Sequence, residues 1–186
     1  IYSLAKKLHK KSCNFHIAYS QEGNGKKQFE ELGVRLIKLE MKSPADFIAA
    51  LQLKRLCRKL SIDIIHTHFL RENYISVLSR FAGNKAKIVN TRHMLLENSK
   101  NVIISNRIFT GFNAAIIAVS NIVKERLIEE GINQRKIKMI YTGIDLDEWR
   151  RQGTVSPETQ GEQRACQLDA VVCADRQMNS VFSGTK

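Results

Sequence analysis

Short apolar runs that end abruptly in polar residues organise this chain. They are residues 62–65, followed by His66, Thr67 and His68; residues 88–90, followed by Thr91, Arg92 and His93; and residues 114–119, followed by Ser120 and Asn121. Short runs rich in β-branched residues are typical of strands buried on both faces of a parallel sheet. Open α/β sheets bind their ligands just beyond the carboxyl ends of such strands. The pattern therefore predicts a ligand site at one edge of a sheet.

The whole chain shows a regular alternation of strand and helix patterns. Strands are predicted to begin near residues 15, 34, 62, 87, 114 and 137, about 24 residues apart, with helical patterns between them. This is the rhythm of repeated βα units with right-handed crossovers. We predict an α/β fold, a Rossmann-like parallel sheet with helices on both faces.

The helix predicted between residues 45 and 60 is amphipathic. Its pattern favours Phe47, Leu51, Leu56 and Leu60 as the inward face. The opposite face is basic and carries Lys54, Arg55, Arg58 and Lys59. Such a face is most often a solvated surface.

The two ends of the chain differ from its middle. The first residues read as a helix without an N-cap, from which we expect that the natural beginning precedes Ile1. Beyond Trp149 no period of 2 or 3.6 persists, and only residues 170–172 are clustered apolar positions. We predict one domain over residues 1–149 and a linker and atypical, disordered tail over residues 150–186.

The charge narrows the partner classes. The chain of 186 residues has a net charge of +12, all of it within residues 1–150, because the four basic and four acidic residues of the remainder cancel. A basic domain favours an anionic partner: nucleic acid, a phosphorylated substrate or an acidic membrane surface. The four cysteines form no CxxC pair and are interpreted as cytosolic thiols.

Five motifs in order resemble the N-terminal domain of family 4 retaining glycosyltransferases, which have the GT-B fold. They are Leu4-Ala5 with Leu8, residues 63–68, residues 91–93, residues 117–120 and residues 138–145. The resemblance covers about residues 1–149. It implies the transfer of a hexosyl group from a nucleotide-sugar to a glycan, lipid or small-molecule acceptor. The nucleotide-sugar would be the donor substrate, and no bound cofactor is implied. It also implies a cytoplasmic enzyme that glycosylates glycans or lipids of the cell envelope. Peripheral contact of this enzyme with the anionic inner face of the membrane is an open alternative.

The departures from the family pattern predict a fragment. The family begins with a strand and a Gly-rich turn that would precede Ile1, and its C-terminal domain with a Glu-x7-Glu motif has no counterpart here. We therefore expect the first, central strand to be missing, between the strands near residues 15 and 62, and the chain alone to be inactive. An unfilled gap would expose two strand edges and favour aggregation.

The resemblance assigns roles to residues at the strand ends. His93 would be catalytic, facing the donor phosphate and the anomeric centre, and the alternative is a capped polar strand end. His66 and His68 should point the same way, because side chains on extended backbone alternate. We expect His68 and Thr91 to bind substrate, with a buried hydrogen-bonded histidine as the alternative, favoured for His66.

Three further residues are candidates for binding substrate anions. Arg71 and Arg92 could each make bidentate hydrogen bonds to a phosphate or carboxylate group of an acceptor. The alternative for both is a solvated surface arginine. Ser120 could cap a helix, or place that helix N-terminus beside an anion.

The resemblance also implies a hinge into a second domain, formed by Thr142, Gly143 and Asp145. The alternative for these residues is a plain turn.

Two other function classes stay open. A basic nucleic-acid-binding module is disfavoured, and no nucleic acid is expected, because the 13 aromatic residues show no regular stacking pattern. A His-x-His metal-dependent hydrolase would need further ligands on later strands, where only Ser120 and Asp145 are offered beside His93. No metal is predicted.

Overall fold

The computed structural model describes residues 1–11, 13–21, 25–93, 99–141 and 170–176. Strands and helices alternate along the chain as the sequence predicts, although the strand expected from residue 62 begins two residues later. The elements are α1 (Tyr2–Leu8), β1 (Cys13–Tyr19), α2 (Lys26–Glu31), β2 (Arg35–Lys38), α3 (Phe47–Lys59), β3 (Ile64–Thr67), α4 (Leu70–Phe81), β4 (Lys87–Arg92), α5 (Lys100–Thr110), β5 (Ala115–Ala118), α6 (Asn121–Glu129), the short 3-10 helix η1 (Gln134–Lys136), β6 (Ile137–Met139) and β7 (Ala170–Arg176).

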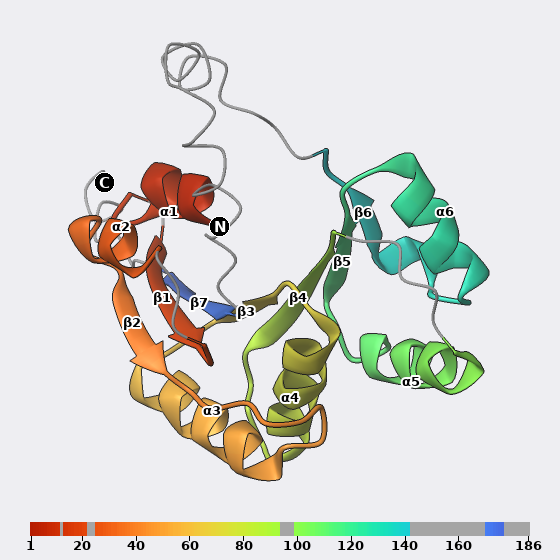
Figure 1. The fold of residues 1–186 in the computed structure, drawn as a ribbon, viewed down its shortest axis with the longest axis horizontal. Coiled ribbons are helices and arrows are strands. Elements are labelled where there is room, and N and C mark those ends of the chain that lie inside the picture. Colours follow the sequence, from red (N-terminus) through yellow and green to blue (C-terminus); the bar gives the residue numbers. More distant parts are fainter. Residues whose placement is uncertain (12, 22–24, 94–98, 142–169, 177–186) are drawn as a thin grey trace, which may run out of the picture.

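The strands form one seven-stranded sheet in the order β2-β1-β7-β3-β4-β5-β6 (Figure 1). Strands β1 to β6 pair in parallel wherever they are neighbours, and helices connect them. Strand β7 is antiparallel to both of its neighbours, β1 and β3. The predicted α/β sheet is therefore confirmed, with one reversed strand near its centre.

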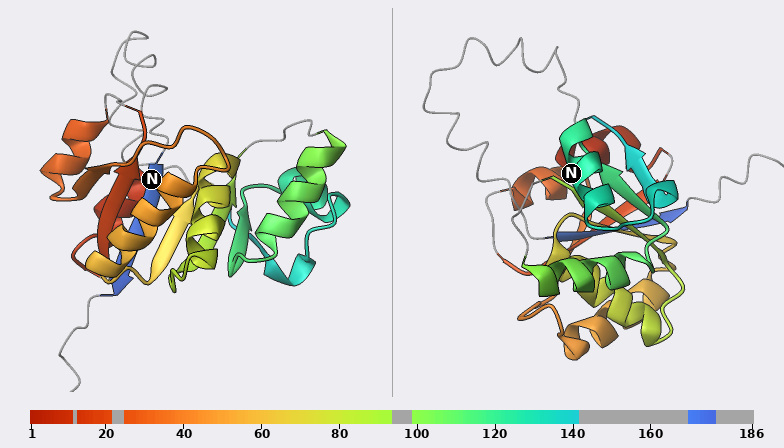
Figure 2. Two further views of the ribbon diagram at one scale, coloured as in Figure 1. Left: turned by 90° about the horizontal axis from the view of Figure 1, so that it is seen from below. Right: turned by 90° about the vertical axis from the view of Figure 1, so that its right-hand side faces the viewer.

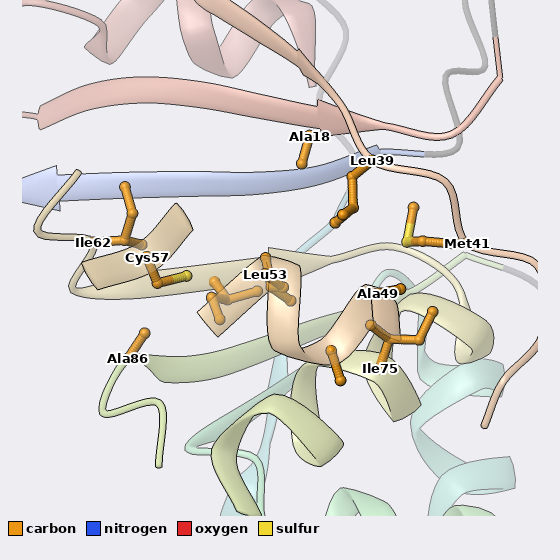
Figure 3. Close-up of a cluster of buried hydrophobic side chains, with 11 residues drawn as sticks. Ala18, Leu39, Met41, Ala49, Leu53, Cys57, Ile62, Ile75 and Ala86 are labelled. Atoms are coloured by element: carbon orange, nitrogen blue, oxygen red, sulfur yellow. The ribbon is translucent and has the colours of Figure 1, made fainter. Parts of the chain in front are cut away.

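Helices cover both faces of the sheet, as expected for a Rossmann-like fold. Helices α3, α4 and α5 lie on one face, and α1, α2 and α6 lie on the other (Figure 2). The largest apolar cluster joins α3 and α4 to the sheet and includes the fully buried Leu53, Ile65 and Ile75 (Figure 3). Burying one such side chain contributes about 1.5–3 kcal/mol. This cluster fixes β3, and thus the strand end that follows it.

Helix α3 packs with a different stripe from the one we predicted. Ala49, Ala50, Leu53 and Cys57 are buried, whereas Phe47 is 61% exposed; of the other residues predicted to face inward, Leu51 is exposed and Leu56 and Leu60 are only partly buried. The prediction of an inward Phe47 and Leu51 is wrong. Two apolar stripes lie side by side on this helix, and the one with alanines allows the closer approach to the sheet.

Residues 170–176 differ from the expected disordered tail, because they form β7. Seven of their positions oppose β1, from Cys13 opposite Arg176 to Tyr19 opposite Ala170, and three oppose β3. Strand β7 occupies the place, between the strands near residues 15 and 62, where the sequence predicts a gap. The boundary at residue 149 lies outside the described residues and stays a prediction.

Candidate functional site

The carboxyl ends of β3 and β4 bring three histidines together. The two strands are parallel neighbours, with His66 opposite Val89, so the residues that follow each strand emerge at the same edge. The rings of His66 and His68 lie 4.4 Å apart, centroid to centroid, which confirms that these two side chains point the same way. His93, which follows β4, completes the histidine cluster.

His68 and His93 are joined by a direct contact between their rings. Nδ1 of His68 lies 2.9 Å from Nε2 of His93, within hydrogen-bonding distance. His68 is half-buried, whereas His93 is exposed. The sequence-predicted catalytic and substrate-binding histidines thus form a pair, with His93 as its outer member.

His66 is held from the neighbouring strand. Its Nε2 lies 2.7 Å from the hydroxyl oxygen of the buried Thr91. Thr91 was expected to bind substrate, but in this structure its hydroxyl group contacts His66. The alternative that we favoured for His66, a hydrogen-bonded structural histidine, agrees with this contact.

Burial keeps the histidine cluster neutral near pH 7. Loss of solvent, with smaller contributions from neighbouring positive charges, lowers the pKa of His66 to about 4 and that of His68 to about 2. Burial also lowers the pKa of His93. The cluster therefore offers neutral imidazoles, which donate with one nitrogen and accept with the other.

Glu72 supports the turn between β3 and α4, and sequence reasoning missed it. This fully buried residue accepts hydrogen bonds at Oε2 from the backbone N–H groups of His68, at 3.3 Å, and Phe69, at 3.2 Å. A carboxylate in the first turn of a helix is favoured by the helix dipole. The available signal was an acidic residue three positions after the N-cap Phe69, as in a capping box.

A second polar pair holds β3 against β4 on the opposite side of the sheet from His66. The side-chain amide of Asn90 donates to the backbone oxygen of Thr67, at 3.3 Å, and to its hydroxyl oxygen, at 2.9 Å. Both residues are fully buried. These bonds fix the spacing of the two strands whose ends carry the histidines.

Arg92 and Arg71 are not placed alike. Arg92 alternates with Thr91 on β4, so its side chain leaves the sheet on the opposite face. It is 9% exposed, and burial lowers its pKa although Glu130 and Tyr74 act in the opposite direction. Arg71 is half-buried in the first turn of α4. The side chain of Arg92 therefore lies on the face of the sheet opposite to the His66–Thr91 contact.

Ser120 caps α6, and the predicted hinge lies outside the described residues. The Ser120 hydroxyl oxygen accepts a hydrogen bond from the backbone N–H of Val123 at 3.3 Å. The helix N-terminus thus lies at the carboxyl end of β5. Thr142, Gly143 and Asp145 lie outside the described residues.

The described residues contain no group of three or more histidine, cysteine, aspartate or glutamate residues arranged to hold a metal ion. In the histidine cluster, one nitrogen of His68 faces a nitrogen of His93 and one nitrogen of His66 faces the Thr91 hydroxyl group. These nitrogens therefore point at each other or at a hydroxyl group, and not at a common centre.

Comparison with known proteins decides the family. The sequence model described as Glycosyltransferase Family 4 matches residues 1–148. The chain belongs to glycosyltransferase family 4. The matched segment of this glycosyltransferase contains the histidine cluster and every strand from β1 to β6.

Two curated relatives are glycosyltransferases. The chain is 25% identical over 151 residues to the capsular polysaccharide biosynthesis glycosyltransferase CapH of Staphylococcus aureus, covering 75% of this chain and 41% of the relative. It is 29% identical over 107 residues to N-acetylgalactosamine-N,N'-diacetylbacillosaminyl-diphospho-undecaprenol 4-alpha-N-acetylgalactosaminyltransferase of Campylobacter jejuni, covering 53% of this chain and 29% of that protein. The chain therefore spans less than half the length of each relative.

Solved structures show the same fold. A glycosyltransferase from Rickettsia africae matches with a TM-score of 0.59 and 23% identity, over 76% of this chain and 38% of its own. Anabaena Alr3699/HepE, solved in complex with UDP and glucose, matches with a TM-score of 0.67 and 15% identity, over 88% of this chain and 44% of its own. At these identities the likeness concerns the fold.

Proposed function

We propose that this chain is the acceptor-side half of a retaining glycosyltransferase that moves a sugar from a nucleotide-sugar to a glycan or lipid acceptor. In that reaction the bond between the anomeric carbon and the phosphate oxygen breaks, and a bond to the acceptor hydroxyl oxygen forms. The hydroxyl proton leaves with the nucleotide diphosphate. The observation that carries the proposal is the His68–His93 pair at the carboxyl edge of the sheet, within the segment that matches the family.

In the proposed enzyme, His93 faces the donor. Its ring is the exposed member of the pair and so is accessible to a ligand, whereas the ring of His68, which contacts it, is half-buried. Thr91 acts through His66 in the same cluster. A neutral imidazole that donates a hydrogen bond stabilises the charge that develops on the leaving phosphate.

We assign supporting roles to the other predicted site residues. Arg71 and the N-terminus of α6 at Ser120 would meet anionic groups of the acceptor. Arg92 could do so only from the face of β4 opposite to Thr91, where it is 9% exposed. Thr142, Gly143 and Asp145 would form the connection to a donor-binding half, and the chain alone would then be inactive.

The exposed start of α3 supports contact with an anionic membrane. Phe47 is 61% exposed and Ile48 is 71% exposed, and Arg58 and Lys59 are exposed farther along the same helix. A crossover helix runs antiparallel to the strands that it joins, so α3 begins at the edge where β3 and β4 end. Exposed apolar side chains and exposed basic ones on the same helix suit the surface of an anionic bilayer, where each cation contributes about 1 kcal/mol.

This contact would place the histidine cluster near a lipid-linked acceptor. The Campylobacter jejuni relative is named for a diphospho-undecaprenol substrate, and the Staphylococcus aureus relative for capsular polysaccharide biosynthesis. No helix in the described part of the chain has the length and apolarity needed to cross a bilayer. We propose a peripheral enzyme on the cytoplasmic face of the inner membrane.

A chimaera tests the proposed function. Residues 1–148 would replace the matching segment of the Staphylococcus aureus relative, and sugar transfer to a membrane acceptor would be measured. We expect transfer, and a loss of turnover of about 100-fold or more in His93→Ala, as for other preorganised electrostatic groups. The matched control is His16→Ala, which removes a half-buried histidine on β1 outside the cluster. Equal turnover of a folded His93→Ala chimaera and its parent would contradict the catalytic role.

A further inference from the structure

The contact between His68 and His93 has the geometry of an in-plane hydrogen bond. The ring centroids lie 5.2 Å apart and the ring planes differ by 20°. With the facing nitrogens 2.9 Å apart, this centroid distance is that of two rings set end to end and not of two rings stacked face to face. When both rings are neutral, one proton occupies this bond. That proton belongs either to Nδ1 of His68 or to Nε2 of His93.

The surroundings of His68 distinguish these two arrangements. Its other ring nitrogen, Nε2, is shielded from solvent and has no hydrogen-bond partner in the described part of the chain. His66 covers the same ring at a centroid distance of 4.4 Å. If the shared proton came from His93, neutral His68 would carry its own proton on this shielded Nε2.

A buried N–H group without an acceptor is the less favourable of the two arrangements. A buried donor or acceptor without a partner costs about 1–3 kcal/mol, and among buried backbone groups an N–H without an acceptor is rarer than an under-used acceptor. The proton of His68 therefore belongs on Nδ1, where it is donated to Nε2 of His93. Since Nε2 of neutral His93 then accepts, the proton of His93 must be on Nδ1, the nitrogen that does not face His68.

We propose that His68 is a positioning residue that holds neutral His93 in its Nδ1–H form, so that the exposed ring presents an N–H donor to an oxyanion. This inference rests on the proposed function in one respect, since it identifies the oxyanion as a phosphate of the nucleotide-sugar. The arrangement needs no proton from solution. An anion attracts the N–H group and would repel the lone pair that the other tautomer places there. His68 thereby allows an uncharged His93 to bind an anion.

Long-range ¹H–¹⁵N correlation NMR on the full chain tests the proposal, because the two ring nitrogens of a neutral histidine shift differently according to which one carries the proton. At pH 7.5 we expect His93 to show a protonated Nδ1 and an unprotonated Nε2. In His68→Phe, which keeps an aromatic ring and removes both nitrogens, the Nδ1–H pattern of His93 should be lost. In His68→Asn, whose side-chain amide offers an N–H donor, part of that pattern should return.

The matched control is His66→Phe. This variant changes the ring that contacts His68 but not the bond to His93, so the Nδ1–H pattern should persist. A proton on Nε2 of His93 in the native chain would overturn the proposal, as would an unchanged tautomer in His68→Phe. These spectra are recorded without donor or acceptor. An inactive chimaera would therefore count against the proposed function and leave the tautomer result standing.

Discussion

His66 and Thr91 come from neighbouring parallel strands, and their side chains meet at 2.7 Å between Nε2 and the hydroxyl oxygen. This contact joins the end of β3 to the end of β4 on the face opposite to the one where Asn90 bonds Thr67. The two strand ends are thus tied together on both faces of the sheet. The strand ends that carry the histidine cluster are therefore held together before any ligand binds.

Removal of the Thr91 hydroxyl group should remove the contact with His66 that joins the end of β3 to the end of β4. In Thr91→Val we expect a loss of about 1 kcal/mol in the free energy of unfolding, the usual contribution of a hydrogen bond. Urea unfolding followed by circular dichroism measures it. A double-mutant cycle with His66→Phe supplies the control, since the double variant should lose less than the sum of the two single losses. Strict additivity would show that the two side chains do not interact.

Acid should destabilise the chain through the half-buried histidines His66 and His68. The pKa of His66 is lowered to about 4 and that of His68 to about 2, against 6.5 for an ordinary histidine. Below pH 6.5 the unfolded chain therefore takes up protons that the folded chain excludes. Stability should fall as the pH falls from about 6.5 toward 4, by up to about 1.4 kcal/mol per pH unit for each histidine.

Urea midpoints between pH 7.5 and 5 measure this dependence above the range in which most carboxylates titrate. The double variant His66→Phe, His68→Phe is the control, because it removes the titrating groups and keeps aromatic rings in the cluster. Its stability should vary less with pH in this window. An equal slope in the variant and the native chain would assign the acid sensitivity to other groups.

The chain alone should bind nucleotide-sugars weakly. In the proposed enzyme the donor-binding residues belong to the other half, so we expect a Kd no tighter than about 1 mM, or about −4 kcal/mol, for any UDP-sugar. Isothermal titration calorimetry on the purified chain measures it, with no sugar transfer detected in parallel. Micromolar affinity would show that the sheet edge at His93 holds a donor site by itself.

The exposed apolar start of α3 should determine binding to anionic vesicles. With equal parts of phosphatidylglycerol and phosphatidylcholine, the double variant Phe47→Ser, Ile48→Ser should bind at least tenfold more weakly, because each side chain loses apolar burial of order 1.4 kcal/mol or more. Sedimentation with the vesicles measures it. The matched control is the pair Ile104→Ser, Ile108→Ser on α5, whose side chains are 57% and 58% exposed. A similar loss in this control would mean that no particular helix docks.

Local patterns predicted the strands, the common direction of His66 and His68 and the edge at which the polar residues gather, since side chains on extended backbone have period 2 and parallel strands end at a common edge. The pattern did not reveal which stripe of α3 is buried. Phe47 is the larger apolar residue, but alanine at positions 49 and 50 lets the helix approach the sheet, and only the tertiary packing decides between them. Glu72 was missed because the N-cap position before it holds Phe69, which is not one of the usual capping residues, so the acidic residue three positions later did not stand out.

Strand β7 was beyond prediction for a different reason. Its partners, β1 and β3, lie more than 100 residues away along the chain, and its pairing is between backbone groups. The sequence did place an open position between these two strands, and the sheet order confirms that position. An unoccupied position would leave two unpaired edges in the middle of a sheet, so any segment able to extend there gains a full set of ladder hydrogen bonds.

An engineered disulfide bridge between β1 and β7 should form if the two strands pair in the observed register. Cys173 lies opposite His16 of β1, and residues directly opposite in an antiparallel pair have Cβ atoms about 4.5–5.5 Å apart, close enough for bridging with small adjustment. In His16→Cys, mild oxidation should therefore form an intramolecular bridge, found by peptide mapping, and raise the free energy of unfolding by about 4 kcal/mol. The control Arg35→Cys places a thiol opposite residue 16 on β2, two strands from Cys173 and about 10 Å away, where no bridge should form. If His16→Cys links only separate copies of the chain, or links equally well from position 35, then residues 170–176 do not hold this place in the sheet, and the two central edges must be covered in another way.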